Sequence, residues 1–415
     1  MSFQNPYDEL RGIIGSHTPV TKELWSTARR SWTKEELEAA SPPTDPPPKA
    51  PLETSITYPF RTNEYLREQY RNPWNEVRLG RLLEDLDSLA GYVALTHCSS
   101  SDPKVRPPLC VTAGVEDIEI RTDTIRLDED MQMSGRVVWT GRSSMDVSME
   151  LQQGGRTQLV ALFTFVARDA LTNAPQLVSP LALTSARDRE VYDLRQARAE
   201  ASRAARRRSV AQATGLHSQG LSTEALRWAG ERLQAGRSLR ALPGLTDPFA
   251  VASSATRLAS SFICFPQQRN AYGRVFGGFL MRRAFELALQ AAYQFSGRRP
   301  LLAKVHEIQF RKPVDVGNLC TYAATILHTW QSQRDPSKGM AHVQIEAAVT
   351  LPEKVTTTIT NTFHFQFVYD LPSDEQGRPI PPRTILPNTE EAALELARFF
   401  GPGADEELAH FTKMP

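Results

Sequence analysis

Apolar residues recur along the chain with two different periods, and these periods follow one another in the same order twice. Residues 81–96 carry apolar side chains at helical spacing, which predicts a helix with one buried face. Segments in which apolar and polar residues alternate come next and predict four strands. These strands are expected at residues 114–120, 133–140, 145–151 and 158–168.

The second half of the chain repeats this order. A helix is predicted at residues 279–293 and strands at 303–310, 320–329, 341–351 and 354–369. Residues 71–83 align with 269–281 without a gap, and five pairs are identical: Arg71/Arg269, Asn72/Asn270, Val77/Val275, Gly80/Gly278 and Leu82/Leu280. No crossover helices separate neighbouring strands, so each copy is expected to fold as one long central helix wrapped by a curved antiparallel sheet. This α+β pattern is typical of a hotdog domain, here present in tandem.

The segments outside the two copies differ from them in composition. Residues 41–51 are polyproline-like and predict a solvated tether, with folded structure beginning after it. Residues around 203–208 form a basic run within a stretch rich in Arg and Ala that predicts helix. The expected division is a Pro-rich extension (1–55), hotdog domain 1 (56–185), a helical connector (186–245), hotdog domain 2 (246–372) and a C-terminal extension with a short helix that packs on domain 2 (373–415).

Charge and composition exclude several classes of function. The 48 Lys and Arg residues balance 47 Asp and Glu residues, so no global field favours nucleic acid or an anionic membrane. Acids also interrupt the basic connector, so nucleic acid is not an expected partner. No apolar stretch approaches the roughly 20 residues of a membrane span. The four cysteines lack disulfide-framework or zinc spacing and are expected to be buried, reduced thiols without a metal.

Each copy places an asparagine ahead of a glycine that opens the helix. Unpaired N–H groups and the dipole at a helix start stabilise developing negative charge. In the second copy Gly277 and Gly278 leave room for a ligand, and Asn270 can add an amide N–H, which predicts an oxyanion site. Tight helix packing is the alternative reason for two adjacent glycines. The first copy offers Asn72 and Gly80, where a leucine takes the place of the first glycine.

The acids of the two helices are asymmetric in the opposite sense. Asp87 lies on or near the apolar stripe of the first helix, either as a catalytic group or as a satisfied core carboxylate. Glu84 and Asp85 are expected to be solvated near the helix start. Phe285 occupies the position of Asp87 in the second copy, and the nearest acid, Glu286, is displaced by about 100° around the helix.

Three segments carry a resemblance to a known family: residues 77–91, residues 270–288 and the Phe-Arg-Lys-Pro-Val-Asp-Val-Gly stretch at 310–317. They resemble the mitochondrial acyl-coenzyme A thioesterases of the type 9 branch, in the tandem-hotdog superfamily, and the likeness covers about residues 58–370. The resemblance implies that the two sheets form one continuous surface. It also implies that each active site takes an Asn and a helix start from one unit and an acid from the other.

Transferred to this sequence, the family pattern matches the oxyanion side to Asn270, Gly277 and Gly278 and the acid to Asp87. The reciprocal site would combine Asn72 and Gly80 with the displaced Glu286. One main active site per chain is therefore expected. Arg311 and Lys312, followed by Arg142, are the candidates for binding the phosphates of CoA.

The implied reaction is hydrolysis of a fatty acyl-CoA to fatty acid and CoA, without a cofactor. A thiolate leaves readily, so a carboxylate and an oxyanion site suffice, with Asp87 acting as general base or as nucleophile. A serine route is disfavoured because the chain has no Gly-x-Ser-x-Gly elbow. The rival functions are a noncatalytic acyl-CoA-binding protein and a hotdog hydratase or dehydratase. A hotdog dehydratase would require a histidine beside the acid, and none flanks Asp87. The single histidines His97, His306 and His342 are interpreted as structural.

The resemblance also implies a homo-oligomer, with a trimer as one form, and a mitochondrial matrix location. The first fifty residues contain many acids, unlike a matrix-targeting presequence, so composition does not show a targeting signal and the cytoplasm is the alternative location.

Overall fold

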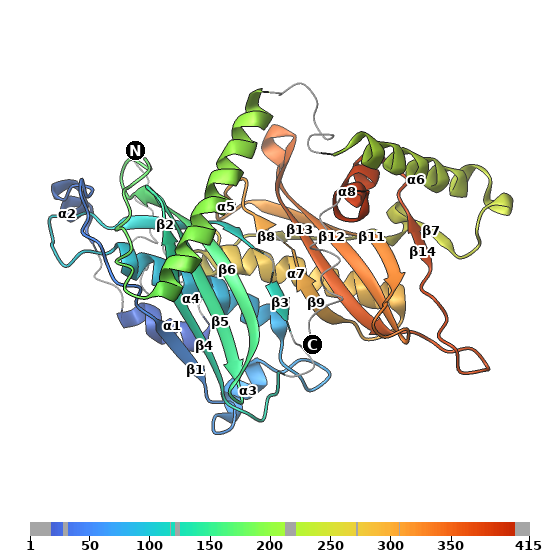
Figure 1. Cartoon of the computed structure of the whole chain (residues 1–415), viewed down its shortest axis with the longest axis horizontal. Helices are drawn as coiled ribbons and strands as arrows, with labels where there is room; N and C mark the ends of the chain where they lie inside the picture. Colours follow the sequence, from blue (N-terminus) through green and yellow to red (C-terminus); the bar gives the residue numbers. More distant parts are fainter. Residues whose placement is uncertain are drawn as a thin grey trace.

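Two long helices occupy the centre of the molecule. The computed structural model describes residues 18–27, 32–116, 118–120, 125–211, 221–270, 273–306 and 308–402. Helices α4 (Leu79–Cys98) and α7 (Gly277–Ser296) pack against each other and extend the two predicted helices at both ends. The first copy lies at one end of the molecule and the second copy at the other (Figure 1).

Each helix is covered by its own antiparallel strands, so the predicted α+β architecture is confirmed. The first copy contributes β1 (Thr54–Tyr58), β4 (Met131–Thr140), β5 (Ser144–Gln153), β6 (Arg156–Asp169), β2 (Pro108–Val115) and β3 (Ile118–Ile120). The second contributes β8 (Leu258–Ile263), β11 (Leu319–Gln331), β12 (Lys338–Leu351), β13 (Thr356–Asp370), β9 (Leu301–Val305) and β10 (Ile308–Gln309).

Two features of the sheets differ from the sequence prediction. One strand of each copy, β1 and β8, precedes the central helix and forms an end of the sheet. The single strands expected at 114–120 and 303–310 each correspond to two strands, β2 and β3 in the first copy and β9 and β10 in the second.

The two sheets join into one, as the family resemblance implied. Ile118 of β3 pairs with Val305 of β9, and Val115 of β2 pairs with Ile308 of β10. In one pairing the first copy contributes the valine and the second copy the isoleucine, and in the other pairing this order is reversed. A pseudo-two-fold axis therefore relates the copies.

The loops that lead into the central helices have the same backbone path. Arg71 bridges Val77 in the first copy, and Arg269 bridges Val275 in the second. The left-handed residue of each turn also coincides, with φ of 64° at Asn75 and 83° at Gly273. Asparagine and glycine are the residues that tolerate this conformation best. The gapless alignment of the repeat is thus reproduced in the backbone.

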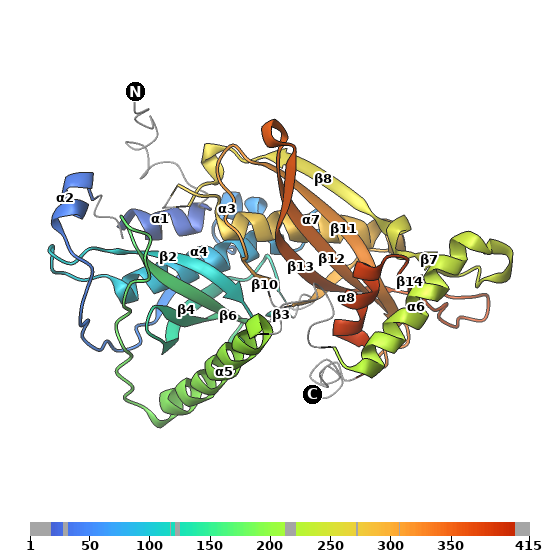
Figure 2. The same cartoon turned by 90° about the horizontal axis from the view of Figure 1, so that it is seen from above.

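The connector is helical, as predicted, and its two helices lie against different copies (Figure 2). Helix α5 (Ala186–Ala211) packs on the outer face of the first sheet, where Arg195 forms ion pairs with Asp146 and Glu116. Helix α6 (Thr223–Ala241) packs on the C-terminal helix α8 (Glu390–Phe400), which lies against β11 of the second copy as predicted. The remaining elements are α3 (Glu64–Gln69) and a parallel pair, β7 (Ala250–Ala252) with β14 (Thr384–Leu386).

The expectation that folded structure begins after the Pro-rich segment is wrong. Helices α1 (Pro19–Thr27) and α2 (Lys34–Ala39) precede that segment, and Trp25 of α1 donates a hydrogen bond to Ser88 of α4 at 3.0 Å. The segment itself is also anchored, because Lys49 Nζ donates to the carbonyl oxygens of His97 and Ser99. An extended chain leaves its polar groups unpaired internally, so they can bond to the adjacent surface.

Four histidines gather under α8 on the outer face of the second sheet. His306, His342 and His364 are buried around Phe399, and His328 contacts Phe400. His342 and His364 share a hydrogen bond of 3.0 Å between Nε2 and Nδ1. These contacts are those of a packed interface, which agrees with the structural interpretation of His306 and His342.

Acid is expected to weaken this interface. Burial holds the pKa values of His342 and His364 well below the ordinary 6.5. The unfolded chain therefore binds more protons than the folded chain below pH 6.5, and each histidine removes up to about 1.4 kcal/mol of stability per pH unit. Thermal unfolding of the wild type and His342→Gln at pH 7.5 and 5.5 should show a smaller acid-induced drop in the variant. Equal drops would assign the acid sensitivity to other groups.

Within the described residues, no helix is both long and apolar enough to cross a membrane.

Candidate active site

The acid of the first copy meets the helix start of the second. Asp87 lies in the middle of α4 with only 2% of its surface exposed, and its Oδ2 accepts the backbone N–H of Gly278 at 2.6 Å. Its other oxygen, Oδ1, accepts the hydroxyl of Thr112 on β2 at 2.9 Å. The structure therefore brings together residues 191 positions apart that the sequence singled out separately.

The two glycines that open α7 have different neighbours. A methyl group on Gly277 would lie 3.0 Å from Asp87 Oδ2 and 3.4 Å from the ring of Phe310. A methyl group on Gly278 would lie 2.9 Å from the backbone oxygen of Glu84. Gly277 thus keeps space beside the carboxylate, whereas Gly278 allows α4 and α7 to touch. The access interpretation therefore applies to Gly277, and the tight-packing interpretation applies to Gly278.

Asn270 lies in the turn that precedes α7. Its backbone N–H donates to Arg274 O at 2.6 Å, and its side-chain oxygen accepts the N–H of Arg274 at 3.2 Å. These bonds fix the side-chain amide as an acceptor on its oxygen side and define the turn. The N–H of Phe276, the N-cap of α7, donates to Gln268 O at 2.9 Å, so hydrogen bonds link the Asn270 segment to the start of α7.

Burial dominates the electrostatics of Asp87. Loss of solvent raises the pKa of its carboxyl to about 6, while the hydrogen bonds from Thr112 and Gly278 act in the opposite direction. Its carboxylate is therefore the main form at pH 7, yet it is more basic than an exposed aspartate. This combination suits a group that must take up a proton near neutral pH.

The reciprocal position is apolar. The ring of Phe285 lies 3.3 Å from where a methyl group on Gly80 would be, as Asp87 lies beside Gly278. Since Val115 and Val305 are equivalent in the joined sheet, Thr112 is equivalent to Leu302, three residues earlier in each strand. The second copy thus has hydrophobic residues in place of both the acid Asp87 and its hydrogen-bond donor Thr112.

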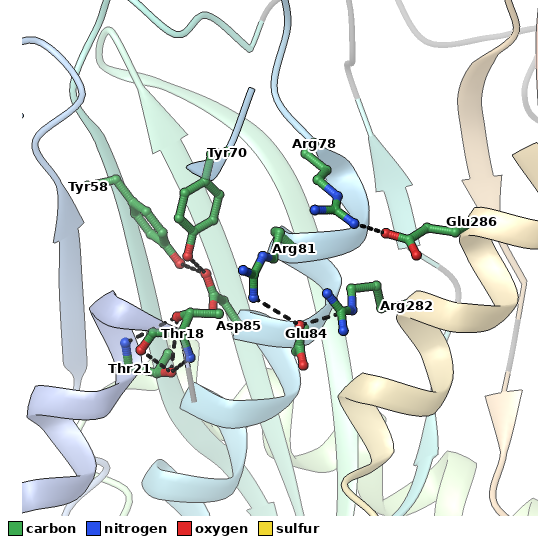
Figure 3. A network of polar contacts seen from close by, with 10 residues as sticks. All are labelled: Thr18, Thr21, Tyr58, Tyr70, Arg78, Arg81, Glu84, Asp85, Arg282 and Glu286. Carbon is green, nitrogen blue, oxygen red and sulfur yellow. Dashed lines mark hydrogen bonds and ion pairs between the residues drawn. The ribbon is translucent and has the colours of Figure 1, made fainter. Parts of the chain in front are cut away.

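The remaining reciprocal candidates form local contacts. Asn72 accepts the N–H groups of Trp74 and Glu76 on its side-chain oxygen. Glu286 forms an ion pair with Arg78 Nη2 at 2.5 Å (Figure 3). Its Oε1 also lies 3.5 Å from where a methyl group on Gly80 would be, so this carboxylate lies near the start of α4 and is held by a guanidinium.

The prediction that Asp85 and Glu84 are solvated is wrong. Asp85 is fully buried and accepts hydroxyls from Tyr58 at 2.8 Å, Thr18 at 2.6 Å and Tyr70 (Figure 3). Burial raises its pKa to about 6 despite these donors. The first turns of α4 are covered by α1, β1 and the end of α3, which a helical pattern alone does not show.

Glu84 is buried because it faces α7 across the pseudo-two-fold axis. Its Oε2 lies 3.2 Å from Nε of Arg282, the residue at the same position of the second copy, and 3.7 Å from Arg81 (Figure 3). Burial raises the pKa of Glu84 to about 7, and the two arginines lower it in part. The helix pair thus has an opposite-charge contact at its centre.

The basic candidates lie in two different places. Arg311 and Lys312 are exposed and directly follow Phe310, whose ring contacts the Gly277 region. Arg142 is exposed in the turn between β4 and β5, and β6 separates β5 from the β2 strand of Thr112. The first pair is therefore better connected to the site than Arg142.

Thr112 is the site residue that sequence reasoning missed. It lies in a strand predicted to begin only at residue 114, so its distance from the helix could not be judged. Cys110, Cys264 and Cys320 are buried reduced thiols and Cys98 is a partly exposed one, and Sγ of Cys264 lies 3.5 Å from Sγ of Cys320. Among the described residues, no group of three or more His, Cys, Asp or Glu side chains could hold a metal ion.

The chain is similar over most of its length to proteins named acyl-coenzyme A thioesterases. The chain is 36% identical over 402 residues to the chloroplastic acyl-coenzyme A thioesterase 2 of Humulus lupulus, covering 92% of this chain and 87% of the relative. It is 33% identical over 372 residues to the human mitochondrial acyl-coenzyme A thioesterase 9, covering 87% and 81%. No protein-family model matches the chain.

Solved structures show a more distant likeness, which concerns the fold. An acyl-CoA hydrolase from Staphylococcus aureus is 20% identical and covers 39% of this chain and 90% of its own, with a TM-score of 0.31. A putative oleoyl thioesterase from Lactobacillus plantarum is 10% identical and covers 78% and 98%, with a TM-score of 0.40.

Proposed function

Because the chain belongs to the acyl-coenzyme A thioesterase family, we propose that it hydrolyses fatty acyl-CoA at one composite site built from Asp87, Asn270, Gly277 and Gly278. The observation that carries this assignment is the hydrogen bond from the Gly278 N–H to Asp87 Oδ2. This bond supports the assignment because it joins an acid of the first copy to the helix start that follows the Asn270 loop of the second copy.

The residues of the site divide into two roles. Gly278 and Thr112 each donate to one oxygen of Asp87, so they orient the carboxylate. The N–H of Gly277 belongs to the first turn of α7, where no intrahelical acceptor is available. This N–H and the amide of Asn270 are proposed to bind the thioester oxygen, with support from the dipole of a 20-residue helix.

The reaction then needs one base and one oxyanion site. Asp87 removes a proton from water as the water oxygen attacks the thioester carbon, and the carbonyl electrons move onto the oxygen held by Gly277 and Asn270. Collapse of the tetrahedral intermediate breaks the C–S bond, with CoA leaving as the thiolate. The products are the free acid and CoA, and the proton on Asp87 returns to solvent or to the thiolate.

The base role of Asp87 is supported by its contacts. Both carboxylate oxygens accept hydrogen bonds, and a covalent acyl bond to Oδ2 would require the Gly278 contact to break. A single turnover in ¹⁸O-water tests for the covalent route. The base mechanism puts label into the fatty acid and none into Asp87; label in Asp87 with an unlabelled first product would show direct attack, followed by hydrolysis of the mixed anhydride at the Asp87 carbonyl.

The wider setting follows from the relatives. Several are mitochondrial and one is chloroplastic by name, so we propose an organelle, the mitochondrial matrix first, as the location. Arg311 and Lys312 are proposed to bind the CoA phosphates, with Arg142 as a secondary candidate, and the protein to form a homo-oligomer. Light scattering of the purified chain measures the last point.

The test of the function is release of CoA thiol, followed with a thiol reagent over short-, medium- and long-chain acyl-CoAs. Wild-type enzyme should release thiol from at least one chain-length class, and Asn270→Ala should reduce the rate by about 100- to 1,000-fold, the range for loss of one oxyanion donor. Absence of thiol release from every substrate would overturn the proposal in favour of a noncatalytic acyl-CoA-binding protein.

The rate should depend on pH through Asp87. Its folded pKa is raised to about 6, and only the carboxylate can accept a proton, so kcat/KM should fall about tenfold per pH unit below pH 6. Thr112→Val removes a donor that stabilises the carboxylate and should move this limb to higher pH. An unshifted limb in Thr112→Val would assign it to another group.

A further inference from the structure

A cavity of about 510 Å³ lies on the opposite side of the pseudo-two-fold axis from Asp87. It is bounded by the asparagine loop and start of the first central helix and by the second helix with β9. Its floor is formed by hydrophobic side chains, mainly Val77, Leu79, Phe285, Leu289, Leu301 and Leu302. The volume is that of a typical small-molecule pocket.

The cavity is equivalent to the active site by symmetry but has lost its acid. Phe285 replaces Asp87 and Leu302 replaces Thr112. Two acids line the cavity, and each is held by an arginine: Glu76 by Arg299, and Glu286 by Arg78, although Oε1 of Glu286 lies only 3.5 Å from where a methyl group on Gly80 would be. The cavity can therefore hold a ligand but has no placed base.

The mouth of the cavity has a different chemistry from its floor. The guanidinium of Arg299 lies 5.4 Å from the ring centre of Trp74 and forms an ion pair with Glu76. Arg71, paired with Glu68, and Arg78, paired with Glu286, lie at the same rim. Each guanidinium group thus has a glutamate partner, so an anionic head group would bind by replacing one of these glutamates, while a straight hydrocarbon tail fits the apolar interior.

We propose that this cavity binds the acyl chain of a fatty acid or an acyl-CoA without hydrolysing it. The inference rests on the proposed function, since it assigns the same ligand class to the symmetric pocket. The tail lies on the floor around Leu289 and Leu302, and the anionic head lies at the rim near Arg299 and Arg78. Substrate or product would thus bind in this pocket without taking part in the reaction.

The test uses the full chain carrying Asp87→Asn, so that ligand is bound without being consumed. Calorimetric titration with lauroyl-CoA should give two equivalents per chain. Adding Leu289→Trp, which fills the floor with an indole, should leave one. When Leu289→Trp is introduced into the enzyme that retains Asp87, the rate of hydrolysis at low substrate concentration should equal that of the wild type, because Leu289 lines the second cavity and not the active site.

The outcomes separate the two proposals. One equivalent both with and without Leu289→Trp would overturn the second pocket and leave the active site intact, whereas no binding at all would overturn both. Titration with lauric acid in place of lauroyl-CoA tests whether the free acid binds. If one equivalent of lauric acid binds and Leu289→Trp abolishes this binding, the free acid occupies the cavity.

Arg299→Ala at the rim is a second variant, one that leaves the core unchanged. It should weaken the affinity for the second equivalent of ligand about tenfold. Unchanged affinities for both equivalents would contradict the proposal.

Discussion

Replacing Asp87 with asparagine should lower kcat by about 10² to 10⁴-fold, the usual contribution of a general base. The amide cannot accept a proton from water, although it has nearly the same shape: its oxygen can still accept the N–H of Gly278 while its NH2 group donates to the hydroxyl oxygen of Thr112. The variant should remain folded, because it removes a buried charge whose pKa is raised by lost solvation. Thiol release from acyl-CoA measures the rate, and circular dichroism with thermal unfolding measures the fold.

Asp85→Asn is the matched control for this change. Asp85 lies two residues away on the same helix, is equally buried and also has a pKa raised to about 6, but its partners are Thr18, Tyr58 and Tyr70. Its hydroxyl network does not touch α7, so activity should stay within a few-fold of wild type while thermal stability changes. Equal losses of activity in both variants would show that any buried acid of α4 is required and would contradict the special role of Asp87.

A methyl group at Gly278 should have the second large effect. In Gly278→Ala the new carbon would lie 2.9 Å from Glu84 O, 3.0 Å from Glu84 Cα and 2.8 Å from the Phe276 ring. Backbone atoms cannot move aside without separating α4 from α7, so we expect a loss of about 1–3 kcal/mol in the free energy of unfolding. Separation also lengthens the bond to Asp87, so kcat should fall by at least tenfold. Urea unfolding and the thiol-release assay measure the two effects.

Gly80→Ala tests the same position in the other copy. There the methyl group would meet side-chain atoms, Arg282 Cγ at 3.1 Å and Phe285 Cδ1 at 3.3 Å, which can shift by a few tenths of an ångström. Alanine also favours the helix by up to about 1 kcal/mol over glycine. The unfolding free energy should therefore stay within about 1 kcal/mol of wild type, with activity retained. A Gly80→Ala variant as damaged as Gly278→Ala would show that the asymmetry between the copies has no mechanical consequence.

Much of the fold followed from local patterns in the sequence. The helices and the order of strands came from periodicity, and the gapless match from Arg71 to Leu82 fixed which residues are equivalent. The strands β1 and β8 were missed because each is short, with 5 and 6 residues, and lies at an end of the sheet ahead of its helix. The N-terminal helix α1 was missed because its packing depends on two side chains, Thr18 and Trp25, whose partners on α4 are more than 60 residues away.

The candidate site was predictable to the extent that it depends on helix position. Asp87 and Gly278 each stood out as exceptions to a local rule, an acid on an apolar stripe and a glycine at a helix start, and the structure joins them. Thr112 has no such signal, because a threonine in a strand is ordinary and its approach to Asp87 is set by the curvature of the sheet. The burial of Glu84 and Asp85 depends on the partner helix and on three distant hydroxyls, neither of which a single-helix pattern contains.

The ion pair between Glu84 and Arg282 has a consequence for assembly. These residues occupy the same position in the two copies and meet where the copies are related by symmetry. If two first copies associated, glutamate would face glutamate in a buried contact, and two second copies would oppose arginine to arginine; uncompensated buried charges of this kind are strongly destabilising. Produced as separate polypeptides, the halves should recognise each other and reject themselves. The opposite charges of Glu84 and Arg282 thus favour pairing of the first copy with the second. Two identical subunits would carry the same residue at this position and could not form this contact.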